Sequence, residues 1–163
     1  VYGLMQGVPT DHPLFSTYWR KRTPPPASMH PDRDGCGLLW CSPVAPNDGR
    51  SAQELTGMAT ELVLRHGFEP LISITVLSDR TISCIISLGY DRNVEGEDGR
   101  AMECYHQLLA SLATKGYYSY RLSIGSMNRM GDENSEYMRF LQNMKALLDP
   151  GGILAPGRYI PEA

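Results

Sequence analysis

The chain has 163 residues, of which 42% are hydrophobic and 20% charged, and its formal net charge is -3 at pH 7. These values are typical of one globular domain that is long enough to bury a core. The slightly acidic balance gives no reason to expect nucleic acid or an anionic membrane as a partner. No apolar run approaches the roughly 20 residues that a membrane span needs, so we expect no membrane association.

The four cysteines, Cys36, Cys41, Cys84 and Cys104, form neither a CxxC pair nor the spacing of a metal site. Cys84 lies in an apolar stretch and Cys104 on a predicted helix, so we expect buried free thiols rather than disulfides. Free thiols suit a reducing compartment. We therefore expect a cytoplasmic protein with no bound metal.

Residues 1–34 are predicted to form an irregular N-terminal arm, and 35–163 to form one folded domain. Three consecutive prolines that begin at Pro24 prevent a helix and favour an extended polyproline conformation. Tyr18 and Trp19 in the same arm argue against a freely disordered tail. The arm is therefore expected to form a short helix or to pack on a surface.

From residue 35 onward the sequence alternates between the patterns of strands and of helices. Short runs rich in β-branched residues predict strands, and apolar residues three and four positions apart predict amphipathic helices. Ser51, with Glu54 three residues later, is predicted to cap the first helix. The predicted strands cover 37–44, 70–77, 81–89 and 118–125, and the predicted helices cover 51–66, 99–115 and 133–148.

This order of elements predicts an α+β fold of the ferredoxin-like βαββαβ type, with an antiparallel sheet, helices on one face and an additional C-terminal helix. We expect the strand at 118–125 to be central and to pair with the strand at 37–44. The helix at 133–148 is expected to turn its apolar face inward. That face consists of Tyr137, Phe140, Leu141, Met144 and Leu147.

The most distinctive chemistry lies in an aromatic stretch that ends in Tyr120 and Arg121. A tyrosine hydroxyl beside a guanidinium that is always charged can hold a phenolate. Neighbouring side chains on a regular strand point to opposite faces. We therefore predict an irregularity at 120–122, at the edge of a cleft, that lets both side chains reach one ligand. The other interpretation is an ordinary pair on the surface.

Three blocks of the sequence resemble the C-terminal, substrate-cap part of the vanillyl-alcohol oxidase and 4-cresol dehydrogenase family of flavoproteins. They cover 37–46, the pair Tyr120 and Arg121, and 149–158, of which the last is the most specific. The resemblance implies that Tyr120 and Arg121 bind a 4-alkylphenol and help to ionise its phenol oxygen. It also implies that Arg158 approaches the ring of FAD, where a fixed positive charge stabilises the anionic reduced ring.

The sequence also departs from this family in several places. It contains no Gly-rich pyrophosphate loop, so FAD would have to be supplied largely by another domain or chain. No His or Tyr stands within 35–45, and we therefore expect no covalent flavin through this chain. Leu122 and Ser123 follow Arg121 where a Thr-His pair is usual, which leaves the substrate and the reaction open.

Two functions are consistent with these observations, and the sequence leaves open whether the chain is an enzyme by itself. In the first, it is the substrate-binding cap of an FAD-dependent oxidoreductase acting on 4-alkylphenols, and a partner chain or domain holds non-covalent FAD. In the second, it is a flavin-free ferredoxin-like homodimer that binds or transforms a phenolic small molecule. The three matching blocks favour the first, and the missing flavin domain favours the second.

Overall fold

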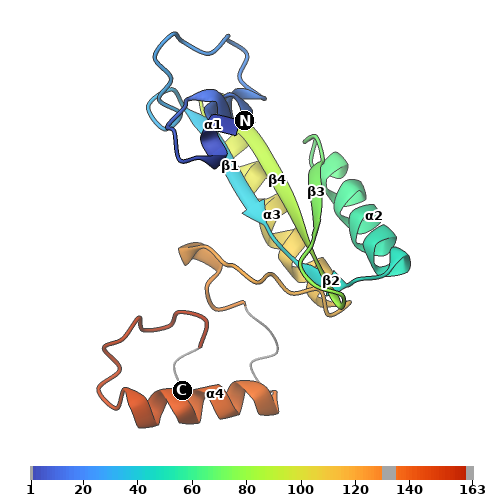
Figure 1. The fold of residues 1–163 in the computed structure, drawn as a ribbon, viewed down its shortest axis with the longest axis vertical. Helices are drawn as coiled ribbons and strands as arrows, with labels where there is room; N and C mark the ends of the chain where they lie inside the picture. The colour runs from blue at the N-terminus through green and yellow to red at the C-terminus, as the bar shows by residue number, and fades with distance from the viewer. Residues whose placement is uncertain (1, 130–134, 161–163) are drawn as a thin grey trace.

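The computed structural model describes residues 2–129 and 135–160 (Figure 1). The arm contains α1 (Tyr2–Met5) and the 3-10 helix η1 (His12–Tyr18). The strands are β1 (Cys36–Cys41), β2 (Val44–Pro46), β3 (Leu71–Val76) and β4 (Thr81–Asp91). The other helices are α2 (Gly49–Arg65), α3 (Glu97–Ala113), the 3-10 helix η2 (Ile124–Ser126) and α4 (Glu136–Leu148).

The long strand β4 is the centre of a four-stranded antiparallel sheet. Its residue Ile86 lies opposite Cys41 of β1 and also opposite Ile72 of β3. Therefore β1 and β2 follow one another along one edge of β4, and β3 pairs with the other edge. Every second side chain of β4 is apolar, and the positions between them are mostly small or polar, with Ile85 as the exception, which is the pattern of a sheet with one buried face.

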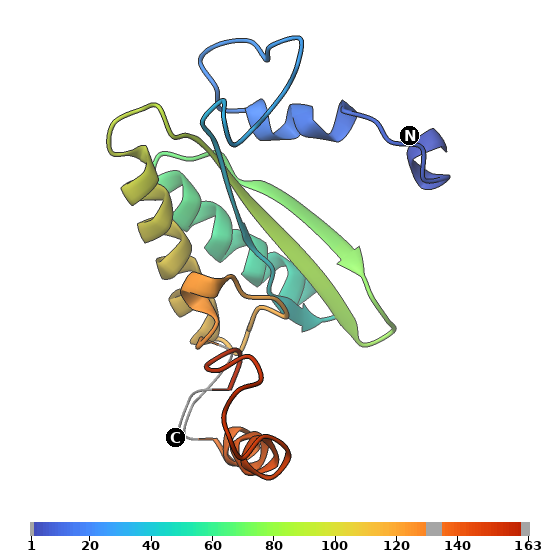
Figure 2. The ribbon, with the colours of Figure 1, turned by 90° about the vertical axis from the view of Figure 1, so that its left-hand side faces the viewer.

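Helices α2 and α3 cover one face of this sheet, as Figure 2 shows. The side chains of β4 that point toward these helices are buried, and burial of such apolar surface is the main favourable term in folding. These side chains are Ile82, Cys84, Ile86, Leu88 and Tyr90. The predicted α+β class, with an antiparallel sheet, helices on one face and an additional C-terminal helix, is thereby confirmed.

The predicted strand at 118–125 is wrong, as is its central place in the sheet. The segment forms one isolated antiparallel bridge, between Ser119 and Pro43, and then continues into η2. The bridge consists of two backbone hydrogen bonds, from the Val44 N–H to the Tyr118 carbonyl and from the Tyr120 N–H to the Ser42 carbonyl, and among the described residues no further backbone bond extends it. The predicted partner strand at 37–44 is divided, because β1 ends at Cys41 and β2 begins at Val44, and β4 occupies the central position.

The predicted cap of the helix at 51–66 is also wrong. Helix α2 begins earlier, and Asp48 is its N-cap. The Asp48 carboxylate accepts the Ser51 N–H at 2.9 Å and the Ser51 hydroxyl at 2.8 Å. Asp is as good a cap as Ser, and Asp48 lies one turn nearer to the preceding strand. Glu54 instead accepts the Tyr117 hydroxyl at 2.7 Å.

Helix α4 forms within the predicted range, but its apolar face is not turned inward. Leu147 is 81% exposed, and Tyr137, Phe140 and Met144 are also exposed. Met138 is the residue of α4 that is buried. The sheet face that was expected to receive this helix is already covered by α2 and α3, and α4 lies away from them (Figure 1). The apolar face of α4 therefore has no partner among the described residues.

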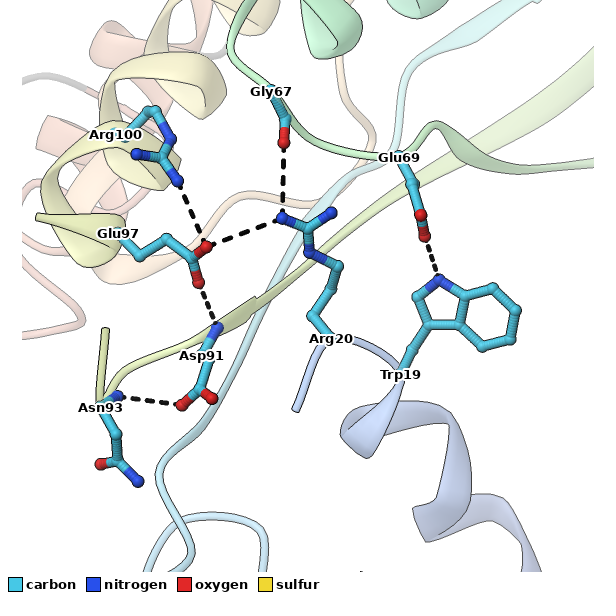
Figure 3. Close-up of polar contacts among 8 residues, drawn as sticks. All are labelled: Trp19, Arg20, Gly67, Glu69, Asp91, Asn93, Glu97 and Arg100. Carbon is cyan, nitrogen blue, oxygen red and sulfur yellow. Dashed lines mark hydrogen bonds and ion pairs between the residues drawn. The ribbon is translucent and has the colours of Figure 1, made fainter. Parts of the chain in front are cut away.

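The N-terminal arm is attached to the domain by a charged cluster around Glu97 (Figure 3). The buried carboxylate of Glu97 accepts the backbone N–H of Asp91 at 2.7 Å and pairs with Arg100 at 3.2 Å. Arg20 of the arm pairs with the same carboxylate at 3.6 Å and donates to the Gly67 carbonyl at 3.4 Å. One carboxylate thus joins the arm, the end of β4 and the start of α3. The boundary of the arm at residue 34 stays a prediction.

A second pair attaches the arm more deeply. Lys21 Nζ lies 2.6 Å from the Asp91 carboxylate, and both side chains are buried. Asp91 also accepts the Asn93 N–H at 3.0 Å. Burial alone would raise the pKa of Asp91, but the hydrogen bonds from Lys21 and Asn93 and the charge of Lys21 together lower it.

Replacing Asp91 by Ala is expected to lower the free energy of unfolding by about 3–5 kcal/mol near pH 7, because it leaves the Lys21 ammonium buried without its partner. The folded-state pKa of Asp91 is depressed. Its stabilisation is therefore present above the unfolded value of about 3.9 and is lost as the pH falls through the folded value. Urea unfolding at several pH values measures the difference, with Asp79→Ala at the exposed hairpin turn as the control. A difference that does not shrink in acid would contradict the assignment.

Candidate functional site

A cavity of about 390 Å³ opens where β1 meets the segments that follow α3 and α4. Its wall is largely apolar, and two guanidinium groups enter it. The lining residues are Leu38, Leu39, Trp40, Ser42, Tyr105, Arg121, Leu122, Ser123 and Arg158. Apolar walls with a few fixed polar groups are typical of small-molecule sites.

The interruption between β1 and β2 brings Arg121 to this cavity. The Val44 N–H donates to the Tyr118 carbonyl at 3.0 Å, and the Tyr120 N–H donates to the Ser42 carbonyl at 3.2 Å. After these two bonds the backbone leaves the sheet and has no regular structure at 120–122. The predicted irregularity at this point is therefore confirmed, and it lies at the edge of a cleft.

The two residues of the predicted pair do not have the same surroundings. Arg121 lines the cavity, whereas Tyr120 is 48% exposed and is not part of the lining. The structure therefore brings Arg121 together with Arg158, and it does not bring Tyr120 with them. A role for Tyr120 in binding the phenol oxygen stays a prediction.

Arg158 enters the cavity from the loop after α4 and is held there by its neighbours. Its guanidinium donates to the Leu122 carbonyl at 3.5 Å and to the Tyr159 hydroxyl at 3.2 Å, and it lies 4.8 Å from the centre of the Tyr159 ring. The Tyr159 N–H donates to the Met127 carbonyl at 3.1 Å. Tyr159 has a φ of 64°, which is rare for a residue other than glycine and is found where surrounding contacts hold a strained backbone.

The end of α4 is tied to this loop by Asp149. This buried carboxylate accepts the Ile153 N–H at 3.0 Å and the Leu154 N–H at 2.9 Å, and it also accepts a hydrogen bond from Lys145. The pKa of Asp149 is lowered, mainly by the hydrogen bond from Lys145 and next by the one from the Leu154 N–H, and these effects outweigh burial, which raises it. Residues 145–154 therefore form one connected unit that leads to Arg158.

The electrostatics of the cavity favour an anion. Neither Arg121 nor Arg158 forms an ion pair with any carboxylate of the described residues. Two positive charges beside an apolar wall, without a carboxylate partner in the described ranges, attract and orient an anionic group more strongly than charges in open water do. No Asp, Glu or His is among the lining residues, so the described part of the chain offers no carboxylate or imidazole base there.

Sequence reasoning missed two of the aromatic residues in the cavity. Neither Trp40 nor Tyr105 belongs to a sequence pattern that we assigned to the site. Tyr105 is buried, and its hydroxyl hydrogen-bonds to Ser126 at 2.8 Å. In the described ranges, no group of three His, Cys, Asp or Glu side chains is placed to hold a metal. Nor do those ranges contain a helix with the length and hydropathy needed to cross a membrane.

No family model matches the chain, but comparisons with individual proteins do find relatives. It is 42% identical over 153 residues to the 1'-carboxy-chondrochloren decarboxylase of Chondromyces crocatus, a match that covers 94% of the chain and 28% of the relative. It is 29% identical over 156 residues to the flavoprotein subunit of the hydroxylating 4-cresol dehydrogenase of Pseudomonas putida, covering 95% of the chain and 27% of the relative.

Solved structures also match the chain. The chain superposes on substrate-bound p-cresol methylhydroxylase with a TM-score of 0.69 and 27% identity, over 76% of this chain and 24% of that one. It superposes on the 4-ethylphenol oxidase of Gulosibacter chungangensis with a TM-score of 0.76 and 22% identity, over 97% and 28%. The chain thus spans about a quarter of the length of the relatives it matches, in their C-terminal part.

Replacing Asp149 by Ala is expected to loosen the loop that carries Arg158, because two backbone N–H groups and Lys145 lose their shared acceptor. Hydrogen exchange at the Ile153 and Leu154 amides should accelerate, whereas the amides of β4 should keep their protection. Glu136→Ala, at the exposed start of the same helix, is the matched control. Unchanged protection at both amides in Asp149→Ala would show that this carboxylate does not hold the loop.

Proposed function

Since this chain belongs to the C-terminal, substrate-cap part of the vanillyl-alcohol oxidase and 4-cresol dehydrogenase family of flavoproteins, we propose that it is the substrate-binding portion of an FAD-dependent oxidoreductase that acts on 4-alkylphenols. The observation that carries this proposal is that Arg121, which pairs with no carboxylate of the described residues, lines a largely apolar cavity. A phenol has an apolar ring and one oxygen that can become an anion. The cavity offers a matching surface for both parts.

Arg121 would act on the ionisation of the substrate. A phenol in water has a pKa of about 10, like that of tyrosine. A guanidinium stays charged at all relevant pH values, so a hydrogen bond from Arg121 to the oxygen lowers the pKa of the bound phenol. The phenolate pushes electron density to the para carbon, which eases the departure of a hydride from the attached alkyl carbon. Tyr120 is the candidate for a second hydrogen bond to the same oxygen.

The residue of this chain that would meet FAD is Arg158. It is positive, is fixed by Leu122 and Tyr159, and has no carboxylate partner among the described residues, which suits a place beside an anionic ring. FAD, when bound, supplies the acceptor for the hydride. We expect this binding to be non-covalent, because positions 35–45 contain no His or Tyr that could anchor a flavin.

A flavin-binding partner, either a domain or a separate chain, would rest on the apolar face of α4. Leu147, Leu148, Ile153 and Leu154 are exposed, and Asp149 connects them to the loop of Arg158. A flavin-binding partner that brings FAD next to Arg158 would therefore also cover these side chains. A second copy of this chain could also bury this face, and that arrangement would be the flavin-free homodimer. The connection from this face through Asp149 to the loop of Arg158 favours the flavin-binding partner.

Replacing Arg121 by Ala is expected to weaken the binding of 4-ethylphenol by about 10- to 100-fold, because a charge-assisted hydrogen bond is lost. The methyl ether of the same compound cannot ionise, so its affinity should change little. Calorimetric titration of both compounds into both variants measures the difference, with Arg80→Ala at the exposed hairpin turn as the control. Equal weakening for the phenol and the ether would contradict the role of Arg121.

Oxidative decarboxylation is a second candidate reaction, favoured by the 42% identity to a decarboxylase and by the lack of a carboxylate or imidazole in the described lining. Loss of a hydride from the carbon next to the ring converts the phenolate to a para-quinone methide. When the next carbon carries a carboxylate, release of CO2 leaves the electron pair of the broken C–C bond to form an alkene and restore the phenolate. Unlike the addition of water, this step needs no base.

The two reactions can be separated with 3-(4-hydroxyphenyl)propanoate and the flavin-loaded protein. Decarboxylation predicts one CO2 and one 4-vinylphenol for each flavin reduced, whereas hydroxylation predicts an alcohol that keeps its carboxylate. Trapped CO2 and product mass are the measurements, and 4-ethylphenol is the matched substrate without a carboxylate. An alcohol that retains the carboxylate as the sole product would rule out this second reaction.

A further inference from the structure

Trp40 occupies an unusual place on the sheet. Its Cα partner on β4 is Ser87, so its side chain shares the face that lies opposite α2 and α3. Its neighbours on the strand, Leu39 and Cys41, point the other way, toward the core. Trp40 is 55% exposed, although it stands beside the apolar wall of the cavity.

Neither a hydrogen bond nor an aromatic pair among the described residues accounts for a tryptophan at this position. The chain has two tryptophans, and the indole N–H of Trp19 donates to Glu69 beside the charged cluster of the arm (Figure 3). The indole of Trp40 makes no such bond within the part of the chain that the structure describes. A large ring with half its surface uncovered gains free energy when an apolar ligand covers it.

The surroundings of Trp40 are suited to a flat ring with one charged end. The side chains of β4 on the same face of the sheet are small or uncharged from Thr81 to Gly89. The charged side chains that line the cavity are Arg121 and Arg158, and both are positive. A ligand that lies along Trp40 can thus direct an anionic oxygen to Arg121 without meeting a negative group of the described lining.

We propose that Trp40 stacks on the aromatic ring of the substrate while Arg121 holds the phenol oxygen. This inference rests on the proposed function of the cavity, and it adds the residue that selects an aromatic ring over a saturated one. Stacked aromatic pairs are offset, and the stacking itself is independent of whether the phenol is ionised. In this proposal Trp40 recognises the aromatic ring of the substrate, and Arg121 recognises its phenol oxygen.

The test uses the full chain and three probes: 4-ethylphenol, its methyl ether, and 4-ethylcyclohexanol. Trp40→Leu should weaken the two aromatic probes by about 2- to 10-fold more than the saturated probe, which is the scale of one aromatic pair beyond the loss of apolar area. Trp40→Phe keeps a ring and should retain most of the affinity. Trp19→Leu, at the other tryptophan, is the matched control and should change none of the three.

The results separate this inference from the function on which it rests. Arg121→Ala should weaken binding of the phenol more than binding of its methyl ether, whereas Trp40→Leu should weaken binding of both by the same factor. Equal loss of the aromatic and saturated probes in Trp40→Leu, or no loss at all, overturns the stacking while the role of Arg121 stands. Failure of the chain to bind any aromatic probe overturns both proposals.

Fluorescence gives a second measurement that does not depend on removing Trp40. In Trp19→Phe, Trp40 is the remaining tryptophan of the chain. Saturating 4-ethylphenol should change its emission, with a midpoint equal to the calorimetric Kd, and 4-ethylcyclohexanol should not. In Trp40→Phe the emission of Trp19 should stay constant. A signal from Trp19 rather than from Trp40 would overturn the proposal.

Discussion

The site depends on how briefly the segment after α3 pairs with the sheet. Beside Pro43, between β1 and β2, this segment forms one isolated bridge of two backbone hydrogen bonds and then leaves the edge of the sheet. A regular strand would have sent Tyr120 and Arg121 to opposite faces of the sheet. The early end of the ladder instead lets the backbone turn away, so that Arg121 lines a cavity beside Trp40. The same edge of the sheet therefore supplies both the charge and the ring surface.

The described residues form a well-buried core, whereas among them the apolar face of α4 has no packing partner and the arginines of the cavity have no carboxylate partner. The apolar residues between the sheet and its two helices are buried, and the charged groups that attach the arm are paired with one another. In contrast, the apolar face of α4 is exposed, and the two arginines of the cavity have no carboxylate partners among the described residues. A monomeric domain rarely leaves so much apolar surface uncovered without a partner. This contrast supports a portion of a larger flavoprotein more than an isolated binding module.

The sequence predicted the parts of the fold that depend on long, periodic segments. Helices α2, α3 and α4 and the hairpin of β3 and β4 lie close to their predicted positions, because apolar spacing over many residues identifies them. It failed for the fourth strand, because the apolar and aromatic pattern at 118–125 indicates strand propensity but not how far the segment pairs with a neighbour. It also failed for the orientation of α4, since an amphipathic pattern shows that one face is covered but not by which element. Trp40 was missed for the same reason, since alternation assigns it to a face of the sheet without showing that it borders the cavity.

The central claim is that this cavity binds a phenol as its anion. The ultraviolet difference spectrum of 4-ethylphenol bound to the full chain near pH 7 tests it most directly, since free phenol is neutral well below its pKa of about 10. We predict that the bound ligand shows the absorption of the phenolate, and that this signal disappears in Arg121→Ala even when the ligand saturates the site. A bound ligand with the spectrum of neutral phenol in the unaltered chain would contradict the account.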